Sequence, residues 1–409
     1  MKILVVSQYF WPETFRVNEI VSELARRGHD VTVLTGRPNY PEGVLHPDFV
    51  AQPGHFSTYA RAPVLRLPLR PRGKGNLRLL LNYWSFVFWG CVLGPWLLRG
   101  RRFDAVFVFG ASPITSALPA ILLKWIKHAP LSMWVLDLWP DTLKAVGIVK
   151  SDRGLRAVGL LCRFIYRHCD LILGQSRAFV EPIRRWAGST HKFRYFPAWS
   201  EEVFDASAEH KMVPAPELAP HAGYFNIVFA GNVGDAQDFP AVLEAARLTH
   251  GRADIRWLIV GDGRAAPLVR AEIDRLGLSD TVFMLGRHPV ERMPSFFAGA
   301  DALLVSLKAD PIFAMTIPGK VQSYLAAGKP LLGMLDGEGA RVITEAGAGL
   351  VAPSGDATAL ALQALALAAL PAGERARMGV EGRLYCDTHF KRGTLMAHLE
   401  DWLADPTAT

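Results

Sequence analysis

A lysine at the start of a predicted helix is the strongest candidate for chemistry in this chain. Within residues 313–333 a Pro-Gly turn precedes Lys320, a helix is expected over 321–327, and Gly328 ends that helix before the next strand. A lysine is unfavourably placed beside the positive end of a helix dipole, whereas an ammonium and the free N–H groups there can together bind an anion. The pattern favours a diphosphate site over an ordinary solvated lysine.

Three further loops rich in small residues follow predicted strands in the same half of the chain. They cover residues 229–239, 260–264 and 335–340. A glycine lets a backbone amide approach a phosphate closely, but one such loop alone is weak support because most strand-to-helix turns contain glycine. Together with the turn before Lys320, these loops at the carboxyl ends of strands indicate a nucleotide site.

The elements that position these loops alternate between strand and helix in both halves. Residues 15–27 place Val17, Ile20, Val21 and Leu24 on one helical face. Apolar runs predict strands at 2–7, 30–35, 105–110, 131–137 and 170–175 in the first half, and at 225–231, 255–263, 281–287, 301–307, 329–335 and 348–353 in the second. This alternation predicts an α/β protein with two Rossmann-like, doubly wound sheets and a ligand cleft between them.

Length and composition also favour two domains. At 409 residues the chain is long for a single hydrophobic core. We expect an N-terminal domain over 1–200 and a C-terminal domain over 224–389. Residues 201–223 are rich in proline and lack periodicity, which predicts a linker. A last helix within 390–409 can pack back on the N-terminal domain.

Charge is unevenly distributed between the two halves. Residues 1–200 contain 27 Lys and Arg against 12 Asp and Glu, whereas residues 201–409 contain 18 against 26. Residues 51–100 contain seven basic residues and no acidic one. A basic stretch rich in aromatic residues beside a long apolar run points to an anionic membrane surface rather than to nucleic acid. The four cysteines form no C-x-x-C pair and do not cluster with histidines, which argues against a zinc site and a disulfide framework.

Residues 79–98 form a long apolar segment that predicts a helix facing the membrane. The segment contains no charged residue and is long enough to span a bilayer. Gly90, Gly94 and Pro95 argue against a span, as does the position of the segment between strands of one sheet. Basic flanks favour a helix lying in the membrane interface, with a fully buried helix and a true span as open alternatives. The predicted membrane contacts are Trp84, Phe88, Trp89 and Trp96.

Seven segments spread over nearly the whole chain resemble the retaining family-four glycosyltransferases, in the order in which that family has them. The likeness is greatest to bacterial members that build colanic acid, O-antigen and capsule repeat units, including N-acetyl-L-fucosamine transferases. It implies the GT-B fold, with acceptor and membrane binding in 1–200 and nucleotide-sugar binding in 224–389. The segments are SQYFWPETFRVNEIVSELARRGHDVTVLTGRPNYP (7–41), LDLWPDT (136–142), FAGNVGDAQ (229–237), IVGDG (259–263), LGR (285–287), GKVQSYLAAGKP (319–330) and DGEGA (336–340).

The donor site departs from the family pattern at the diphosphate pair. The Arg and Lys that the family places in the first loop of the second domain correspond here to Asn232 and Gln237. Both side chains can donate hydrogen bonds, but neither carries charge. The resemblance therefore leaves Lys320 as the main cation for the diphosphate.

The family's two-glutamate motif is also absent. Its positions fall near Met315 and at Ser323. Ser323 can still bond a ribose hydroxyl, and Thr316 and Glu338 are candidates for the sugar contact. The complete set of expected nucleotide-sugar contacts is Gly231, Asn232, Gln237, Gly261, Asp262, Gly263, Arg287, Thr316, Lys320, Ser323, Glu338 and Gly339.

Three charged residues of the first half are candidates for the acceptor side. Glu13 can orient an acceptor hydroxyl and Arg16 can reach a phosphate, with helix capping by Glu13 and Thr14 as an equally favoured alternative. Asp137 follows a predicted strand and can contact sugar or acceptor, or serve only as a helix cap or loop bond. We take Lys320, Glu13 and Asp137 as the catalytic candidates.

The resemblance predicts an enzyme, a glycosyltransferase of the retaining hexosyltransferase type. The sugar would be an N-acetylated hexosamine or deoxyhexosamine that moves from a UDP-sugar to a lipid-diphosphate-linked saccharide, although the residues leave GDP and dTDP donors open. Transfer would need no metal and no cofactor, since no D-x-D motif at a strand end has histidines nearby. We expect a peripheral or monotopic protein on the cytoplasmic face of the bacterial inner membrane. The alternatives are a GT-B-fold sugar-nucleotide epimerase and a nucleotide-binding membrane scaffold without activity.

Overall fold

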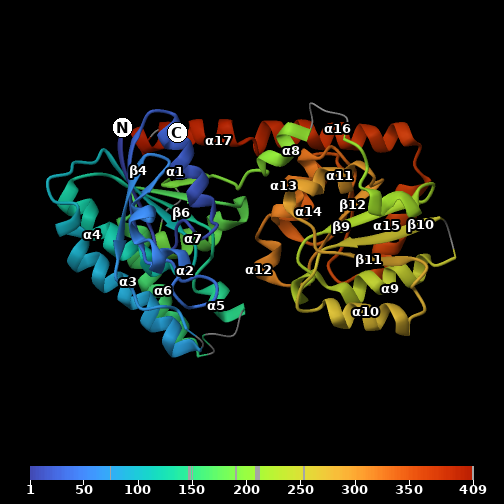
Figure 1. The fold of residues 1–409 in the computed structure, drawn as a ribbon, viewed down its shortest axis with the longest axis horizontal. Helices are drawn as coiled ribbons and strands as arrows, with labels where there is room; N and C mark the ends of the chain where they lie inside the picture. Colours follow the sequence, from blue (N-terminus) through green and yellow to red (C-terminus); the bar gives the residue numbers. More distant parts are fainter. Residues whose placement is uncertain are drawn as a thin grey trace. The chain divides into compact units, whose positions relative to one another are not determined.

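The chain folds into two compact units, each built on a parallel sheet with helices packed on it (Figure 1). The computed structural model describes residues 1–73, 75–145, 149, 151–188, 191–207, 212–251 and 254–407. Unit 1 consists of Met1–Pro197 and Leu395–Thr409, and unit 2 consists of Ala198–Thr394. Both units have the alternation of strand and helix that the apolar runs predict.

Among the described residues, unit 1 holds an eight-stranded sheet in the order β3-β4-β2-β1-β5-β6-β7-β8. The printed pairings are parallel except that of β3 with β4. The order reverses between β1 and β5, and the loops after these two strands leave the sheet at a switch point, where such folds bind ligands. The strands are β1 (Lys2–Ser7), β2 (Asp30–Gly36), β3 (Thr58–Tyr59), β4 (Ala62–Leu67), β5 (Ala105–Gly110), β6 (Leu131–Val135), β7 (Leu171–Gly174) and β8 (Phe193–Tyr195).

Strands β3, β4 and β8 of unit 1 were not predicted from the sequence. Pro63 and Arg66 interrupt the apolar run of β4, and β8 has only three residues. The helices of this unit are α1 (Arg16–Arg26), α2 (Pro47–Ala51), α3 (Asn76–Leu97), α4 (Ala117–Lys127), α5 (Asp141–Ala145), α6 (Asp152–His168) and α7 (Val180–Ala187), with α17 (Arg392–Ala404) from Leu395 onward.

The described part of unit 2 holds a six-stranded sheet in the order β11-β10-β9-β12-β13-β14, with all its printed pairings parallel. Counted within the unit this is the order 3-2-1-4-5-6 of dinucleotide-binding folds, and its switch point lies between β9 and β12. The strands are β9 (Phe225–Ala230), β10 (Ile255–Val260), β11 (Val282–Gly286), β12 (Ala302–Ser306), β13 (Leu331–Met334) and β14 (Gly349–Ala352). The helices are α8 (Glu202–Ser207), α9 (Phe239–Thr249), α10 (Ala266–Arg275), α11 (Met293–Ala298), α12 (Pro311–Ala314), α13 (Gly319–Ala326), α14 (Gly337–Glu345), α15 (Ala357–Ala369) and α16 (Ala372–His389).

The segment predicted as a linker, 201–223, is part of unit 2 where the structure describes it. It contains α8 and a 3-10 helix at Pro216–His221, and its residues 208–211 lie outside the described residues. Phe204 and Leu218 are buried in the unit. Helical turns this short show no periodicity in the sequence, which is why the segment resembles a linker. The first part of unit 1 ends at Pro197 rather than at residue 200.

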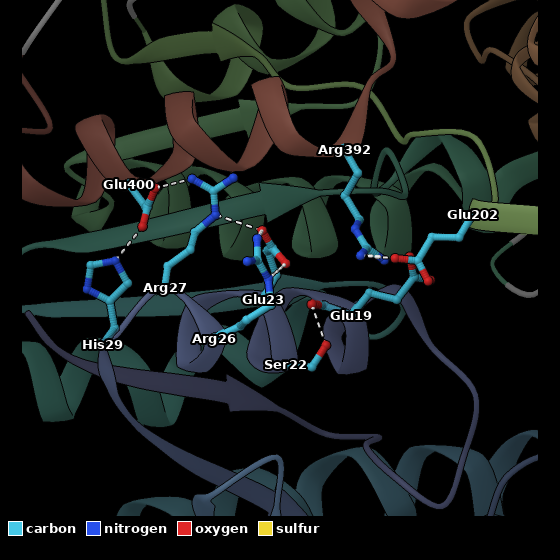
Figure 2. Close-up of polar contacts among 9 residues, drawn as sticks. All are labelled: Glu19, Ser22, Glu23, Arg26, Arg27, His29, Glu202, Arg392 and Glu400. Carbon is cyan, nitrogen blue, oxygen red and sulfur yellow. Dashed lines mark hydrogen bonds and ion pairs between the residues drawn. The ribbon is translucent and has the colours of Figure 1, made fainter. Parts of the chain in front are cut away.

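The last helix, α17, is tied to unit 1 by a cluster of ion pairs (Figure 2). Arg27 donates from Nη1 to Glu400 Oε2 at 2.6 Å, and His29 Nε2 lies 2.6 Å from Glu400 Oε1. Arg27 also donates from Nε to Glu23 Oε1 at 2.7 Å. The Glu400 side chain is only 21% exposed, so these pairs are partly shielded from water.

Glu400→Gln is expected to lower the free energy of unfolding of unit 1 by about 1.5–3 kcal/mol, because the amide has no charge and only one of its two polar atoms can accept a hydrogen bond. Urea unfolding of the whole protein, followed by near-ultraviolet circular dichroism, measures the change. Asp401→Asn, an exposed carboxylate-to-amide change on the same helix, is the matched control. Equal stability losses in the two variants would contradict a specific role for Glu400.

Candidate functional site

A pocket of about 720 Å³ opens among the loops at the carboxyl ends of the strands of unit 2. Its lining comes from the loops after β9, β10 and β11, from α8 and the residue before it, from α11, and from the start of α13. The predicted residues that line it are Gly231, Asn232, Gly261, Asp262, Gly263, Arg287, Lys320 and Ser323. The pocket therefore brings together most of the residues that the sequence singled out.

The two glycine loops of the pocket interlock backbone against backbone. Gly261 adopts φ +152°, and a Cβ built on it would lie 1.9 Å from the carbonyl oxygen of Gly231. A Cβ on Gly263 would lie 2.4 Å from the carbonyl oxygen of Val233. The amide of Gly261 donates to Gly286 O at 2.7 Å, and the amide of Val233 donates to Asp262 O at 3.0 Å. Side chains are excluded here, so backbone forms this wall of the pocket.

Lys320 lies at the first turn of α13 beside these loops. Its Nζ donates to Gln237 Oε1 at 2.8 Å and lies 4.7 Å from the ring centre of Phe229. A Cβ built on Gly231 would lie 2.8 Å from Lys320 Cε, so the absence of a side chain at that glycine makes room for the lysine. Burial lowers the pKa of Lys320 to about 8. The arrangement places one cation and the free amides of a helix start at the floor of the pocket.

Binding of UDP is expected to weaken as the pH rises above about 8. With a pKa of about 8, Lys320 is still mostly charged at neutral pH. It loses its proton as the pH rises through about 8. An anion binds the charged form, so affinity changes little between about pH 7 and 8 and falls by up to about tenfold per unit above that range. Isothermal titration calorimetry with UDP between about pH 7 and 9 measures the profile. Lys320→Met should bind weakly with a flat profile, and an equal decline in that variant would assign the pH dependence to another group.

Two further side chains shape the pocket and were not predicted. The Tyr324 hydroxyl accepts from the amide of Ala230 at 2.9 Å and donates to its carbonyl at 3.1 Å, which fixes the end of β9. Glu201 lines the pocket, and its Oε2 accepts from the Ser323 hydroxyl at 2.5 Å. Glu201 lies in the segment predicted as a linker. Its place in the pocket becomes apparent only from its contact with Ser323, which is distant in the sequence.

The other predicted residues of unit 2 lie outside this lining. Gln237 acts through its bond to Lys320. The Thr316 hydroxyl donates to Phe313 O at 3.0 Å, and Glu338 is buried in an ion pair with Arg341 at 2.8 Å. Gly339 lies in α14, where a Cβ would meet the Leu335 side chain at 2.5 Å. Thr316, Glu338 and Gly339 are thus engaged in local contacts, and their roles toward a sugar stay predictions.

Glu13 is buried at the carboxyl end of β1, where it ties two loops together. Its Oε1 accepts from the amides of Asn39 and Tyr40 at 2.6 and 2.7 Å, and its Oε2 accepts from the amide of Phe10 at 3.0 Å. Burial raises the pKa of Glu13, against the opposing effect of these three hydrogen bonds. The carboxylate does not cap α1, whose N-cap is Phe15. A contact with an acceptor hydroxyl stays a prediction.

Arg16 begins the helix that follows β1, and Asp137 lies in the loop after β6. Asp137 Oδ2 accepts from the amide of Ser112 at 3.0 Å, a bond that joins the loops after β5 and β6. Arg16 forms an ion pair with Glu19 at 3.4 Å. The loop bond that we considered for Asp137 is therefore present, and its role toward sugar or acceptor stays a prediction.

Helix α3 has one face in the core of unit 1 and one face open. Asn82 is fully buried, accepting from Gln8 Nε2 at 2.7 Å and donating to Arg70 O at 2.6 Å. Leu77–Leu97 is long and apolar enough to cross a membrane by length and composition, but one face packs against α4. The open face forms a stripe at helical spacing, which we call the apolar stripe. It consists of Leu77, Leu81, Trp84, Phe88, Val92 and Trp96, which are 40–72% exposed.

The apolar stripe excludes one of the three arrangements that the sequence left open for this helix. A fully buried helix is wrong, because Trp84, Phe88 and Trp96 are 51%, 57% and 65% exposed. Trp89, the fourth predicted membrane residue, is half-buried. Of the described basic residues near the ends of the stripe, Arg72 is half-buried and the others are exposed, namely Arg70, Arg78, Arg99, Arg101 and Arg102.

Known proteins resemble both units of this chain. The family models described as "Glycosyl transferase 4-like domain" and "Glycosyl transferases group 1" match residues 14–199 and 224–369. The putative colanic acid biosynthesis glycosyl transferase WcaI of Escherichia coli (strain K12) is 25% identical over 344 residues, which are 80% of this chain and 82% of that protein.

Solved structures match nearly the whole chain. Anabaena Alr3699/HepE, solved in complex with UDP, has a TM-score of 0.68 at 14% identity and covers 99% of this chain and 100% of its own. An E. coli structure described as trehalose-6-phosphate bound with UDP-2-fluoro glucose has a TM-score of 0.70 at 13% identity, with 99% of both chains covered. These likenesses confirm the predicted fold. With a glycosyltransferase domain matched in each half and two parallel α/β units, the chain is a glycosyltransferase of the GT-B fold.

Proposed function

We propose that this protein is a retaining glycosyltransferase of bacterial surface polysaccharide synthesis, of the O-antigen or capsule type. It moves an N-acetylated hexosamine or deoxyhexosamine from a UDP-sugar to a lipid-diphosphate-linked saccharide. The observation that carries the donor part is the pocket of unit 2, where Lys320 and two glycine loops meet at the switch point of the sheet. The likeness to WcaI and to structures solved with UDP and UDP-2-fluoro glucose supports the same reading.

The mechanism follows from the charges that develop when the sugar leaves its nucleotide. Negative charge grows on the β-phosphate while the sugar becomes positive. Lys320 and the amides at the start of α13 are fixed donors for that negative charge, and fixed donors act most strongly in a site shielded from water. The leaving phosphate accepts the proton of the attacking hydroxyl on the same face of the sugar. This route retains the configuration, and we propose it without a metal or a cofactor.

The apolar stripe supports a lipid-linked acceptor. A soluble protein rarely exposes a continuous row of large apolar side chains, and exposed arginines at its ends suit anionic headgroups. A sugar-nucleotide epimerase, which needs no acceptor, has no use for such a face. We propose that the protein lies on the cytoplasmic face of the inner membrane as a peripheral or monotopic protein, and the apolar stripe supports the membrane contact.

A transfer assay tests the proposed reaction. The purified protein is incubated with UDP-N-acetylhexosamines and a short-chain lipid-diphosphate saccharide, and the products are separated by mass and their anomeric configuration is read by NMR. We expect a lipid product with the donor's configuration and release of UDP. Inverted configuration would contradict the retaining mechanism, and an epimerised UDP-sugar formed without lipid would favour the epimerase.

Removing the aromatic side chains of the apolar stripe is expected to abolish vesicle binding without affecting UDP binding. The triple variant Trp84→Ser, Phe88→Ser and Trp96→Ser loses apolar area that would enter the bilayer interface, which predicts a loss of at least about 30-fold in affinity for phosphatidylglycerol vesicles. Flotation with labelled vesicles measures it.

The matched control for the stripe removes three equally exposed apolar side chains from unit 2. Leu268, Leu362 and Leu384 are 74%, 62% and 60% exposed, and all three are changed to Ser. This control should bind vesicles like the unaltered protein. Equal vesicle binding by the two triple variants would show that the stripe is not the membrane contact.

A further inference from the structure

A second pocket, of about 460 Å³, opens in unit 1 beside the loop after β1. Trp11 and Pro12 of that loop line it together with residues of α2 and of the 3-10 helix at Pro53–Ser57. All of its lining belongs to unit 1, and none of it belongs to α3. The pocket is therefore separate from the donor site of unit 2 and from the apolar stripe.

Aromatic rings form one wall of this pocket. The ring centre of Trp11 lies 4.6 Å from that of Phe56 and 5.7 Å from that of His55. Tyr59 packs on the same indole, with its ring centre at 5.4 Å. Trp11 is half-buried and lines the pocket, so a ligand there can reach the indole. Such a surface offers a flat apolar face to a planar or ring-shaped ligand.

Polar side chains on successive helical turns form the other wall. Asp48, Gln52 and His55 all line the pocket. The amide of Gln52 donates to Asp48 O at 2.9 Å and the amide of His55 donates to Gln52 O at 3.1 Å, so these residues follow one another turn by turn. The Asp48 side chain is 81% exposed, with its Oδ2 3.9 Å from His46 Nδ1. This wall presents hydrogen-bond donors and acceptors to a ligand.

Arg66 of β4 holds the two walls together. Its guanidinium donates to the carbonyl oxygens of Trp11 at 2.5 Å, Phe56 at 3.3 Å and Gly36 at 3.0 Å. The Phe49 ring packs over the same guanidinium, with its centre 5.2 Å from Cζ. The loop after β1 and the segment 49–56 are therefore fixed to each other before any ligand binds, which lowers the entropic cost of binding.

The chemistry of the two walls selects the class of ligand. Asp48 disfavours a phosphate, because like charges repel. The three polar side chains disfavour an acyl chain, because burying them beneath it would remove their hydrogen bonds to water. A sugar ring satisfies both walls, since its C–H face can pack on the Trp11 indole while its hydroxyls bond to Asp48, Gln52 and His55.

We propose that this pocket binds a sugar ring of the acceptor saccharide, other than the ring that receives the transferred sugar. Glu13, the candidate contact for the reacting hydroxyl, follows Pro12 directly in the loop but does not line the pocket. A ring held in the pocket is therefore a neighbour of the reacting ring. The proposal rests on the proposed transferase function and deepens it, because it implies an acceptor of more than one sugar.

Binding of simple glycosides tests the pocket without any need for turnover. Saturation-transfer NMR is recorded on the full-length protein with the methyl glycosides of N-acetylglucosamine, N-acetylfucosamine, galactose and rhamnose. The unaltered protein should transfer saturation to at least one of them, and the double variant Gln52→Ala and His55→Ala should not. Both altered side chains are exposed, so the variant should keep its fold and its calorimetric affinity for UDP.

A matched control changes the exposed residues Val50 and Thr58, both to Ala. They flank the same segment but do not line the pocket, and this control should bind the glycosides like the unaltered protein. The proposal is overturned if no glycoside is saturated by the unaltered protein, or if the two double variants give equal signals. Saturation of uridine that disappears in the Gln52 and His55 variant would instead assign the pocket to a base.

Acceptor kinetics separate this proposal from the function on which it rests. In the Gln52 and His55 variant the KM for a lipid-diphosphate disaccharide should rise about tenfold, the usual effect of losing one or two hydrogen bonds. The KM for a lipid-diphosphate monosaccharide should rise much less, and the KM for the UDP-sugar should stay the same. Equal rises for the two acceptors overturn the subsite. Glycoside binding that is lost in the variant, in a protein that transfers sugar to neither acceptor, contradicts the proposed function and leaves a saccharide site.

Discussion

Lys320→Ala is expected to lower the rate of sugar transfer by about 10²–10³-fold, the usual loss when one fixed donor to a developing anion is removed. Lys320 lines the pocket at the start of α13. Its ammonium donates a hydrogen bond to the Gln237 side chain and lies over the Phe229 ring. Neither Asn232 nor Gln237 brings positive charge to the first loop. The leaving diphosphate therefore loses the counter-charge at the helix start, and both kcat and the affinity for the nucleotide should fall.

Two companion variants separate the lost charge from a lost fold. Lys320→Met keeps an unbranched apolar chain against Phe229, and it should unfold no earlier than the unaltered protein because a partly buried ammonium is removed. Lys391→Ala removes an exposed lysine and should leave turnover unchanged. Steady-state kinetics with the UDP-sugar and thermal unfolding are measured for each. Full turnover in Lys320→Ala would remove the lysine from the mechanism.

Gly261→Ala is expected to destabilise unit 2 by about 3 kcal/mol or more and to abolish nucleotide binding. The residue adopts φ +152°, and its new Cβ would lie 1.9 Å from the Gly231 carbonyl oxygen. Neither strand loop can yield freely, because the Gly231 amide is bonded to Val260 O at 2.9 Å and the Gly261 amide to Gly286 O at 2.7 Å. The new side chain would force the two glycine loops apart, and the pocket wall that they form would be disrupted.

Gly277→Ala is the matched control for this clash. Gly277 also has positive φ, +66°, but a Cβ there would meet nothing within 4 Å. It should cost only the left-handed conformation, about 1–2 kcal/mol, and leave UDP affinity intact. Urea unfolding gives the stability of each variant, and calorimetry gives its affinity for UDP. Similar losses in the two variants would show that backbone conformation, rather than the contact between loops, sets the cost.

The sequence by itself determined the parts of this protein that depend on local pattern. Apolar runs located the six strands that the structure describes in unit 2, and the turn chemistry around Gly231, Gly261 and Lys320 located the pocket. These signals are local because a strand needs a short apolar run, and a loop that approaches its neighbour backbone to backbone needs glycine. Strand β4 was not predicted because Pro63 and Arg66 interrupt its apolar run.

Only the tertiary structure decided which distant groups meet. Glu201 reaches Ser323 across 122 positions and Lys320 reaches Gln237 across 83, separations at which no periodicity or spacing rule applies. The buried carboxylate of Glu13 accepts from backbone amides of its own loop and of the loop after β2, and Asn82 buries one face of α3 in the core. Such outcomes depend on the order of strands in the sheet, because that order sets which loops and helix faces become neighbours.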